Sequence, residues 1–165
     1  NNMKNLITVI ALFLLATLYM NAQDISKNAV GVRFGDNDGF GGEISYQYSL
    51  GDRTRMEVDL SFRNNNDFGD SFKLTALHQW VWRIDGDFNW YAGFGAGIGS
   101  WDKGNNYSGD ADDGVFLNAD GNVGIEYNFE IPLLISLDFR PEIDLIGDYG
   151  DESDFDIALS LRYQF

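Results

Sequence analysis

The stretch WYAGFGAGIGSW, residues 90–101, carries a glycine at every second position between flanking aromatic residues. The four glycines are Gly93, Gly95, Gly97 and Gly99. Glycine is a poor former of both helices and strands, so a strict period of two needs a structural reason. Alternation with alanine, phenylalanine and isoleucine is typical of a strand with two different faces. We therefore expect a strand here, with one face that has no room for side chains.

The same alternation recurs along the chain, in segments separated by clusters of glycine, asparagine and aspartate. The apolar phase of these segments covers residues 30–34, 40–50, 56–62, 72–82, 90–98, 115–127, 133–145 and 155–165. None of them has a sustained helical period. The sequence therefore predicts an all-β fold with eight antiparallel strands, in which one face of the sheet is apolar.

The opposite phase of these segments is charged and nearly balanced, with seven cations and nine anions. Its members are Arg33, Glu43, Arg55, Glu57, Asp59, Arg63, Lys73, Arg83, Asp120, Glu126, Asp138, Arg140, Glu142, Asp144, Asp156 and Arg162. A soluble barrel would bury the apolar face, whereas a membrane barrel would bury the charged one. Alternation alone does not separate these two arrangements.

The N-terminal residues have the features of a secretory signal peptide. Lys4 precedes a 15-residue apolar run, and Ala22 follows it at a small-residue cleavage position. That run is shorter than the roughly 20 residues of a spanning helix. We expect residues 1–22 to be the signal peptide, with Asn1 and Asn2 upstream of the initiator Met3, and residues 23–165 to be the barrel domain.

The lengths of the connections favour the membrane barrel. Tight links near 51–54, 85–89 and 129–132 alternate with mostly longer polar ones near 35–39, 64–70, 101–114 and 146–153, as in outer-membrane barrels. Backbone groups in lipid must all be paired, so the sheet has to close. Eight strands enclose a lumen that side chains just fill, and the glycines of residues 90–101 then make room for long charged side chains from other strands.

The C-terminal segment ALSLRYQF ends in alternating apolar residues and a final phenylalanine. With the signal peptide and the strand pattern, it resembles the small OmpA/OmpX-type outer-membrane β-barrels and, more loosely, the outer-membrane-protein β-barrel-domain families. The resemblance implies a Gram-negative cell envelope, contact with outer-membrane lipid and lipopolysaccharide, and an assembly signal for the barrel-assembly machinery. The residues of that signal are Leu161, Tyr163 and Phe165.

The search for catalytic chemistry finds no convincing site, so we expect a protein that is not an enzyme and has no cofactor. His78 is the only histidine, and Trp80 stands where barrel deacylases carry a serine. We expect its ring near a membrane interface. The acids around Arg140 are expected to form ion pairs rather than an acid–base pair. The net charge of −15 argues against nucleic-acid partners, which require a basic patch.

The long connections are strongly acidic, with twelve acids opposed only by Lys103. They form a solvated surface in our interpretation, and no metal site is expected, although Asp110, Asp112 and Asp113 are weak candidates for a hard cation. Trp101 and Tyr107 are the expected apolar contacts for an extracellular partner.

Three functions remain open: a structural or surface-interaction barrel, a narrow porin-like transport barrel similar to OmpW, and a lipid-modifying enzyme. The first is preferred because a near-balanced lumen favours a plug of ion pairs over a selective pore. We also expect Pro141 to cause a bulge or a broken ladder bond, because proline cannot donate a hydrogen bond.

Overall fold

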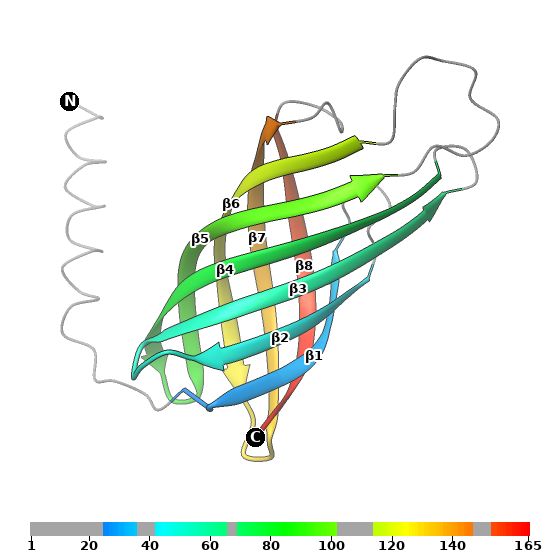
Figure 1. The fold of residues 1–165 in the computed structure, drawn as a ribbon. Coiled ribbons are helices and arrows are strands. Elements are labelled where there is room, and N and C mark those ends of the chain that lie inside the picture. The colour runs from blue at the N-terminus through cyan, green and yellow to red at the C-terminus, as the bar shows by residue number, and fades with distance from the viewer. Residues whose placement is uncertain (1–24, 36–41, 66–68, 102–113, 147–152) are drawn as a thin grey trace, which may run out of the picture.

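Eight strands form the whole of the regular structure in the computed structural model, which describes residues 25–35, 42–65, 69–101, 114–146 and 153–165. The strands are β1 (Asn28–Gly35), β2 (Glu43–Ser49), β3 (Thr54–Asn65), β4 (Gly69–Asp85), β5 (Phe88–Trp101), β6 (Gly114–Asn128), β7 (Leu133–Ile146) and β8 (Ser153–Gln164). Each strand is antiparallel to the next, and β8 pairs with β1, so the sheet closes into a barrel (Figure 1). This confirms the predicted fold class.

The expected signal peptide lies outside the described residues. Among the residues that are described, no helix is long and apolar enough to cross a membrane.

The connections divide between the two ends of the barrel. Three short ones join β2 to β3, β4 to β5 and β6 to β7 at one end, which we call the turn end (Figure 1). The other four leave from the opposite end, the loop end; the β3–β4 connection there, residues 66–68, is as short as the turns, and the other three are longer. In the β4–β5 turn, Gly86 has a φ of 52°, a left-handed conformation that suits glycine. The predicted tight links are therefore confirmed.

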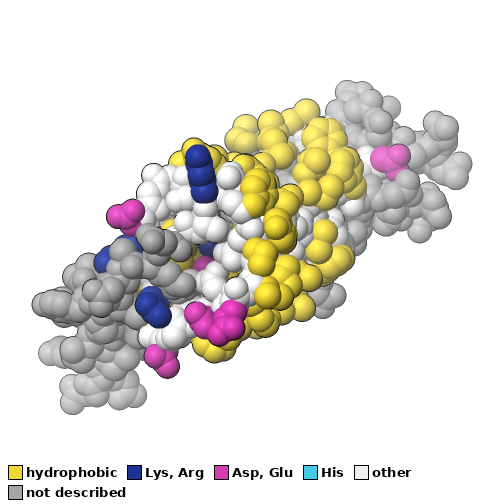
Figure 2. All heavy atoms as spheres, turned by 90° about the horizontal axis from the view of Figure 1, so that it is seen from below, with side chains coloured by type: hydrophobic (Ala, Val, Ile, Leu, Met, Phe, Trp, Pro, Cys, Tyr) yellow, Lys and Arg dark blue, Asp and Glu magenta, His cyan; other side chains and the backbone are white. Residues whose placement is uncertain are grey.

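The side chains are distributed inside out relative to a soluble protein. Arginine, glutamate, aspartate and amide side chains are buried inside the barrel, while large apolar side chains on all strands are exposed. One exposed example from each strand in turn is Val32, Ile44, Met56, Leu74, Phe94, Val123, Leu137 and Leu159. Figure 2 shows hydrophobic side chains gathered over part of the visible surface, with white atoms between them and charged side chains beside them. The soluble arrangement considered above is therefore excluded.

The glycines of β5 face the lumen, as the sequence predicts. A Cβ on Gly97 would lie 2.3 Å from Asn118 Oδ1 and 2.8 Å from Lys73 Cε, and one on Gly99 would lie 2.2 Å from Phe116 Cζ. Real Cβ atoms do not approach other atoms so closely. The space beside β5 is thus filled by side chains that come from β4 and β6.

Pro141 interrupts the β6–β7 ladder without a bulge. The paired residues run from Asp120 opposite Glu142 to Val123 opposite Phe139, and the two positions between them are unpaired. The register is the same on both sides of this gap. The register shift of this strand pair lies instead at Leu117 and Asn118. The prediction of a bulge or a broken ladder bond is therefore confirmed by the break in pairing, which needs only the missing N–H of Pro141.

Candidate functional site: the ion-pair network of the lumen

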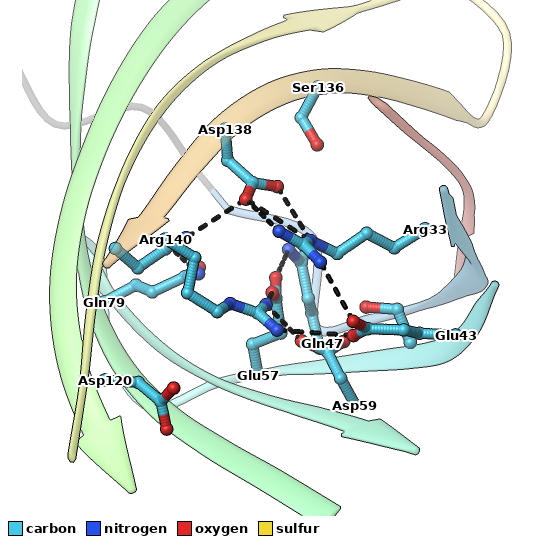
Figure 3. A network of polar contacts seen from close by, with 12 residues as sticks. Arg33, Glu43, Gln47, Glu57, Asp59, Gln79, Asp120, Ser136, Asp138 and Arg140 are labelled. Atoms are coloured by element: carbon cyan, nitrogen blue, oxygen red, sulfur yellow. Dashed lines mark hydrogen bonds and ion pairs between the residues drawn. The ribbon is translucent and has the colours of Figure 1, made fainter. Parts of the chain in front are cut away.

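Arg33 on β1 is the most connected cation of the lumen. Its Nη1 lies 3.0 Å from Glu43 Oε1 and 2.6 Å from Asp156 Oδ2. Its Nη2 lies 2.6 Å from Asp138 Oδ1 on β7, and Nε donates to the same carboxylate. The Arg33 side chain is fully buried, and Figure 3 shows its guanidinium between Asp138 and Glu43.

Arg140 enters the lumen from β7, which only β8 separates from β1, and shares an acid with Arg33 (Figure 3). Glu43 joins the two guanidiniums, since its Oε1 accepts from Arg33 and its Oε2 lies 3.3 Å from Arg140 Nη1. Arg140 Nη2 also donates to Glu57 Oε1, at 3.2 Å, and to Asp59 Oδ2. One arginine thus serves carboxylates from β2 and β3.

A third arginine, Arg162 on β8, binds nearer the turn end. Its Nη2 donates to Glu57 Oε2 at 3.1 Å, and its remaining donors reach the hydroxyls of Ser45 and Ser136 at 3.0 and 2.9 Å. The amide of Gln47 also donates to Glu57. These contacts tie β2, β3, β7 and β8 together across the lumen.

Arg55 on β3 connects the network to amide side chains on β4 and β6. Its Nε donates to Gln79 Oε1 at 2.7 Å, and Gln79 in turn donates to Asn122 at 2.7 Å. Arg55 Nη2 lies 2.8 Å from Glu126 Oε2, so the two groups form an ion pair. The N–H groups of Nη2 do not point at this oxygen, and no hydrogen bond forms between these two atoms. The guanidinium carbon is 4.8 Å from the ring centre of Tyr91, a cation–π geometry.

The remaining cation, Lys73 on β4, lies near the loop end. Its Nζ is 2.6 Å from Glu142 Oε1 and 3.8 Å from Asp120 Oδ1. Asn118 Nδ2 donates to both acids at 3.1 Å. Lys73 reaches these partners on β6 and β7 because β5, which lies between, presents glycine there.

The network buries its arginine side chains. Arg33, Arg55, Arg140 and Arg162 are each no more than 1% exposed. Apolar side chains fill further space inside the barrel, among them Leu77, Val81, Tyr91, Phe116 and Leu134. Five cations and seven acids of the described chain are buried, so the interior carries a small negative excess.

Most of the predicted lumen residues are brought together. The first exception is Arg83. Its side chain is exposed at the turn end, where Nε donates to the carbonyl of Gly86 at 2.8 Å. Its position in the alternation is inward, but it lies beyond the enclosed part of the barrel, so its placement in the lumen was wrong. Asp144 is only half-buried, and the side chain of Arg63 lies outside the described residues.

The other predicted positions divide between the outer wall and the undescribed loops. Leu161, Tyr163 and Phe165 face outward and are exposed. The Trp101 side chain, Tyr107, Asp110, Asp112 and Asp113 lie outside the described residues, as does Lys103. In the described part of the chain, no group of three or more His, Cys, Asp or Glu residues is arranged to hold a metal ion.

His78 lies in the outward phase of β4 and is partly exposed, and its expected place near a membrane interface stays a prediction. Its ring packs edge-on against Trp80 with 4.5 Å between ring centres. Trp82, four residues further along β4, stacks on Trp90 at the turn end.

Several neutral residues complete the site; the alternation predicted four of them inward, but it did not predict that they link the charged groups. Gln47, Gln79, Asn118 and Asn122 carry the network between charged groups, and Tyr91 fills the lumen beside Gly124. Their inward phase was readable from the alternation, but neutral side chains gave no signal of their own.

Comparison with known proteins identifies the fold. No family model matches the chain, and no curated protein does. Among solved structures, the N-terminal β-barrel domain of Pseudomonas aeruginosa OprF is similar over 86% of this chain and 100% of that one, with a TM-score of 0.64 and 13% identity. Neisserial surface protein A has a TM-score of 0.55 and 13% identity, over 84% and 94%.

A third similar structure is Ail, the attachment invasion locus protein of Yersinia pestis. It covers 85% of this chain and 97% of its own, with a TM-score of 0.55 and 16% identity. Ail has also been solved with the heparin analogue sucrose octasulfate and in a phospholipid bilayer nanodisc. At these identities the likeness shows the fold, which is that of small outer-membrane β-barrels.

Proposed function

We propose that the chain is a non-enzymatic barrel of the bacterial outer membrane, with a structural or surface-interaction role and a lumen filled by ion pairs. The observation that carries this proposal is the inverted distribution of side chains, with a charged interior and an apolar outer wall. Such a wall is stable only where lipid covers it. The fold shared with OprF, Neisserial surface protein A and Ail supports the same location.

The membrane places the two ends of the barrel in different compartments. Short turns face the periplasm and longer loops face outward in known outer-membrane barrels, so the loop end is the external one in this proposal. Export would depend on the signal peptide of residues 1–22. Assembly would use Leu161, Tyr163 and Phe165, which lie in the outward phase of the last strand.

In a surface-interaction role, the loops at the external end would bind the partner. These loops are acidic, so they favour a partner that carries positive charge, unlike the sulfated ligand in the Ail structure. Trp101 and Tyr107 are the proposed apolar contacts. Outer-membrane lipid and lipopolysaccharide would contact the wall.

Transport is the second candidate, and the filled lumen argues against it. The decisive test is single-channel recording of the refolded barrel in planar bilayers. We expect no steady conductance from the unmodified chain, because the four buried arginines and the apolar side chains occupy the lumen. Steady single-channel steps would show that transport is the better assignment.

A lipid-modifying enzyme is the least supported candidate. Lipid A mass spectra from cells with and without the protein should be identical if it has no such activity. A modification that is present with the protein and lost with His78→Ala would overturn the non-enzymatic proposal.

A further inference from the structure

The ladder between β6 and β7 is irregular twice within its loop-end half. Gly121 and Asn122 have no paired residue on β7, although the residues on either side of them do. Nearer the loop end, the register shifts between Leu117 and Asn118. The other seven strand junctions are continuous over their described pairs, except for a shift beside the β4–β5 turn. Among the described residues, the barrel wall is therefore least regular between β6 and β7.

The two unpaired positions have one cause, the missing N–H of Pro141, which lies opposite Gly121. In an antiparallel ladder, pairs that exchange hydrogen bonds alternate with pairs that do not. When the lost bond is the one from Pro141 to the Gly121 carbonyl, this pair and the next one lose their pairing and the pairs beyond keep theirs. The observed gap has this length. The Gly121 carbonyl thus has no donor in the ladder, which weakens the junction there.

Polar side chains hold this junction from the lumen side. Asn118 Nδ2 on β6 donates to Glu142 Oε2 on β7 at 3.1 Å, and Lys73 Nζ from β4 lies 2.6 Å from Glu142 Oε1. Glu142 therefore joins the loop-end half of β7 to two other strands. Its side chain is 15% exposed, compared with at most 7% for the other acids in the described ion pairs. This bond is the one in the network that solvent reaches most easily.

The loop-end half of β7 is firmly attached to β8. Their ladder is unbroken through Pro141, which is opposite Phe155, and the rings of Phe139 and Phe155 are 5.7 Å apart. β1 pairs with β8 as far as Ala158, opposite Gly35, so Ser153–Ile157 are paired with β7 alone among the described residues. A two-stranded ribbon is only marginally stable by itself. Its closed position therefore depends on the junction with β6.

We propose that the loop-end half of the β6–β7 junction is a gate in the barrel wall, which Glu142 holds closed. Residues 141–146 of β7 would move away from β6 together with the paired part of β8, and Pro141 would be the hinge. Opening would expose the polar groups around Lys73 at the side of the barrel rather than at its end. The gate is independent of the surface role proposed above, because it needs only the folded barrel.

Amide hydrogen exchange, measured by NMR on the refolded chain in detergent micelles, tests this proposal. By the alternation of the ladder, the amides of Gly121 and Ile143 bond across the gate. Those of Val123 and Phe139 bond across the same junction on the turn side of the gap. We expect the first two amides to exchange at least about tenfold faster, since one hydrogen bond accounts for up to such a factor.

Pro141→Val separates the missing donor from ordinary fraying near the strand ends. The variant restores the N–H opposite the Gly121 carbonyl, so exchange of the Gly121 and Ile143 amides should slow about tenfold. Ile157→Val is the matched control. It is an outward change on β8, opposite Phe139, that adds no donor, and it should leave both rates unchanged.

Glu142→Gln tests the side chain that holds the gate closed. It removes the charge that pairs with Lys73, so exchange of the Ile143 amide should become about tenfold faster. Glu130→Gln, an exposed change at the turn end, is the control and should have no effect. Folding of each variant is checked by its gel mobility with and without heating. If Glu142→Gln does not fold, Pro141→Val and its control decide the matter.

Three results would overturn the proposal. Equal exchange on the two sides of the gap in the unmodified chain would mean that the junction does not open locally. Unchanged rates in Pro141→Val would mean that the missing donor has no part in the opening. Unchanged rates in a folded Glu142→Gln variant would contradict a gate that Glu142 holds closed.

Discussion

Arg33 and Asp138 face each other through a two-point contact, although they lie 105 residues apart and their strands, β1 and β7, are not neighbours in the sheet. Arg33 Nη2 donates to Asp138 Oδ1 at 2.6 Å, and Nε donates to Oδ2 at 3.2 Å. This geometry matches the planar fork of a guanidinium to a carboxylate. The contact bypasses β8 and joins the first strand to the seventh across the lumen.

Arg33→Met should therefore be strongly destabilising. It leaves Asp138 without its main cation and removes one cation from Glu43 and Asp156. Breaking a buried ion pair from one side costs about 3–5 kcal/mol. The free energy of unfolding, measured by urea titration in lipid vesicles, should fall by that amount. Lys27→Met, an exposed change at the turn end, is the control and should have almost no effect.

Arg140→Ala should lower the unfolding midpoint far more than Arg83→Ala or Lys103→Ala. Arg140 serves Glu43, Glu57 and Asp59 inside the barrel, while Arg83 is exposed and contacts only a turn carbonyl in the described structure. Exposed arginine contacts are worth at most about 1 kcal/mol. Equal shifts for Arg140 and Arg83 would mean that water reaches the lumen charges freely, in disagreement with their burial.

Gly97→Ala should destabilise the barrel by about 1–3 kcal/mol, the usual range for overpacking. Its Cβ would collide with Asn118 Oδ1 and the Lys73 stem, which must move away from Glu142. Gly42→Ala is the matched control, because the nearest atom to its Cβ would be 3.9 Å away. Urea unfolding of both variants makes the comparison. A tolerated Gly97→Ala would show that β5 does not need glycine for space.

Leu159→Arg tests whether the outer wall faces lipid. Leu159 is exposed near the middle of β8, between Phe34 and Leu137 of the neighbouring strands. Arginine at the midplane of a membrane barrel costs about 2–4 kcal/mol, and near the interface about 0–1 kcal/mol. Leu50→Arg at the turn end should thus be much milder in vesicle unfolding assays. Two equally mild changes would contradict a lipid-facing wall.

The alternation predicted the strands and their faces well, because side-chain direction in a strand has a fixed period of two. Within one strand it assigned Lys73 inward and Phe72 outward, and both are found so. The ends of strands were less predictable. β4 extends from Gly69 to Asp85, beyond the apolar phase of residues 72–82. The polar residues at the ends of the strand still pair with the neighbouring strands.

The sequence did not predict which charged side chains form ion pairs with one another. Arg33 and Asp138 are both inward on pattern alone, yet their contact depends on how the closed sheet staggers its strands. Arg83 has the same phase as its lumen neighbours but lies past the end of the enclosed volume. Depth along the barrel axis is not encoded in the alternation either.

The pairing of β1 with β8 gives the barrel a circular order. Asn28 and Phe165 exchange two backbone hydrogen bonds, of 3.0 and 2.9 Å, at the point where the first and last strands meet. In the finished wall, this seam is bonded like every other strand junction. Because residues 28 and 165 are adjacent there, a short linker could join them and the chain could begin instead at one of the loop-end connections. Such a circular permutant would keep every strand neighbour, while the order in which the hairpins form during folding would be rotated around the barrel.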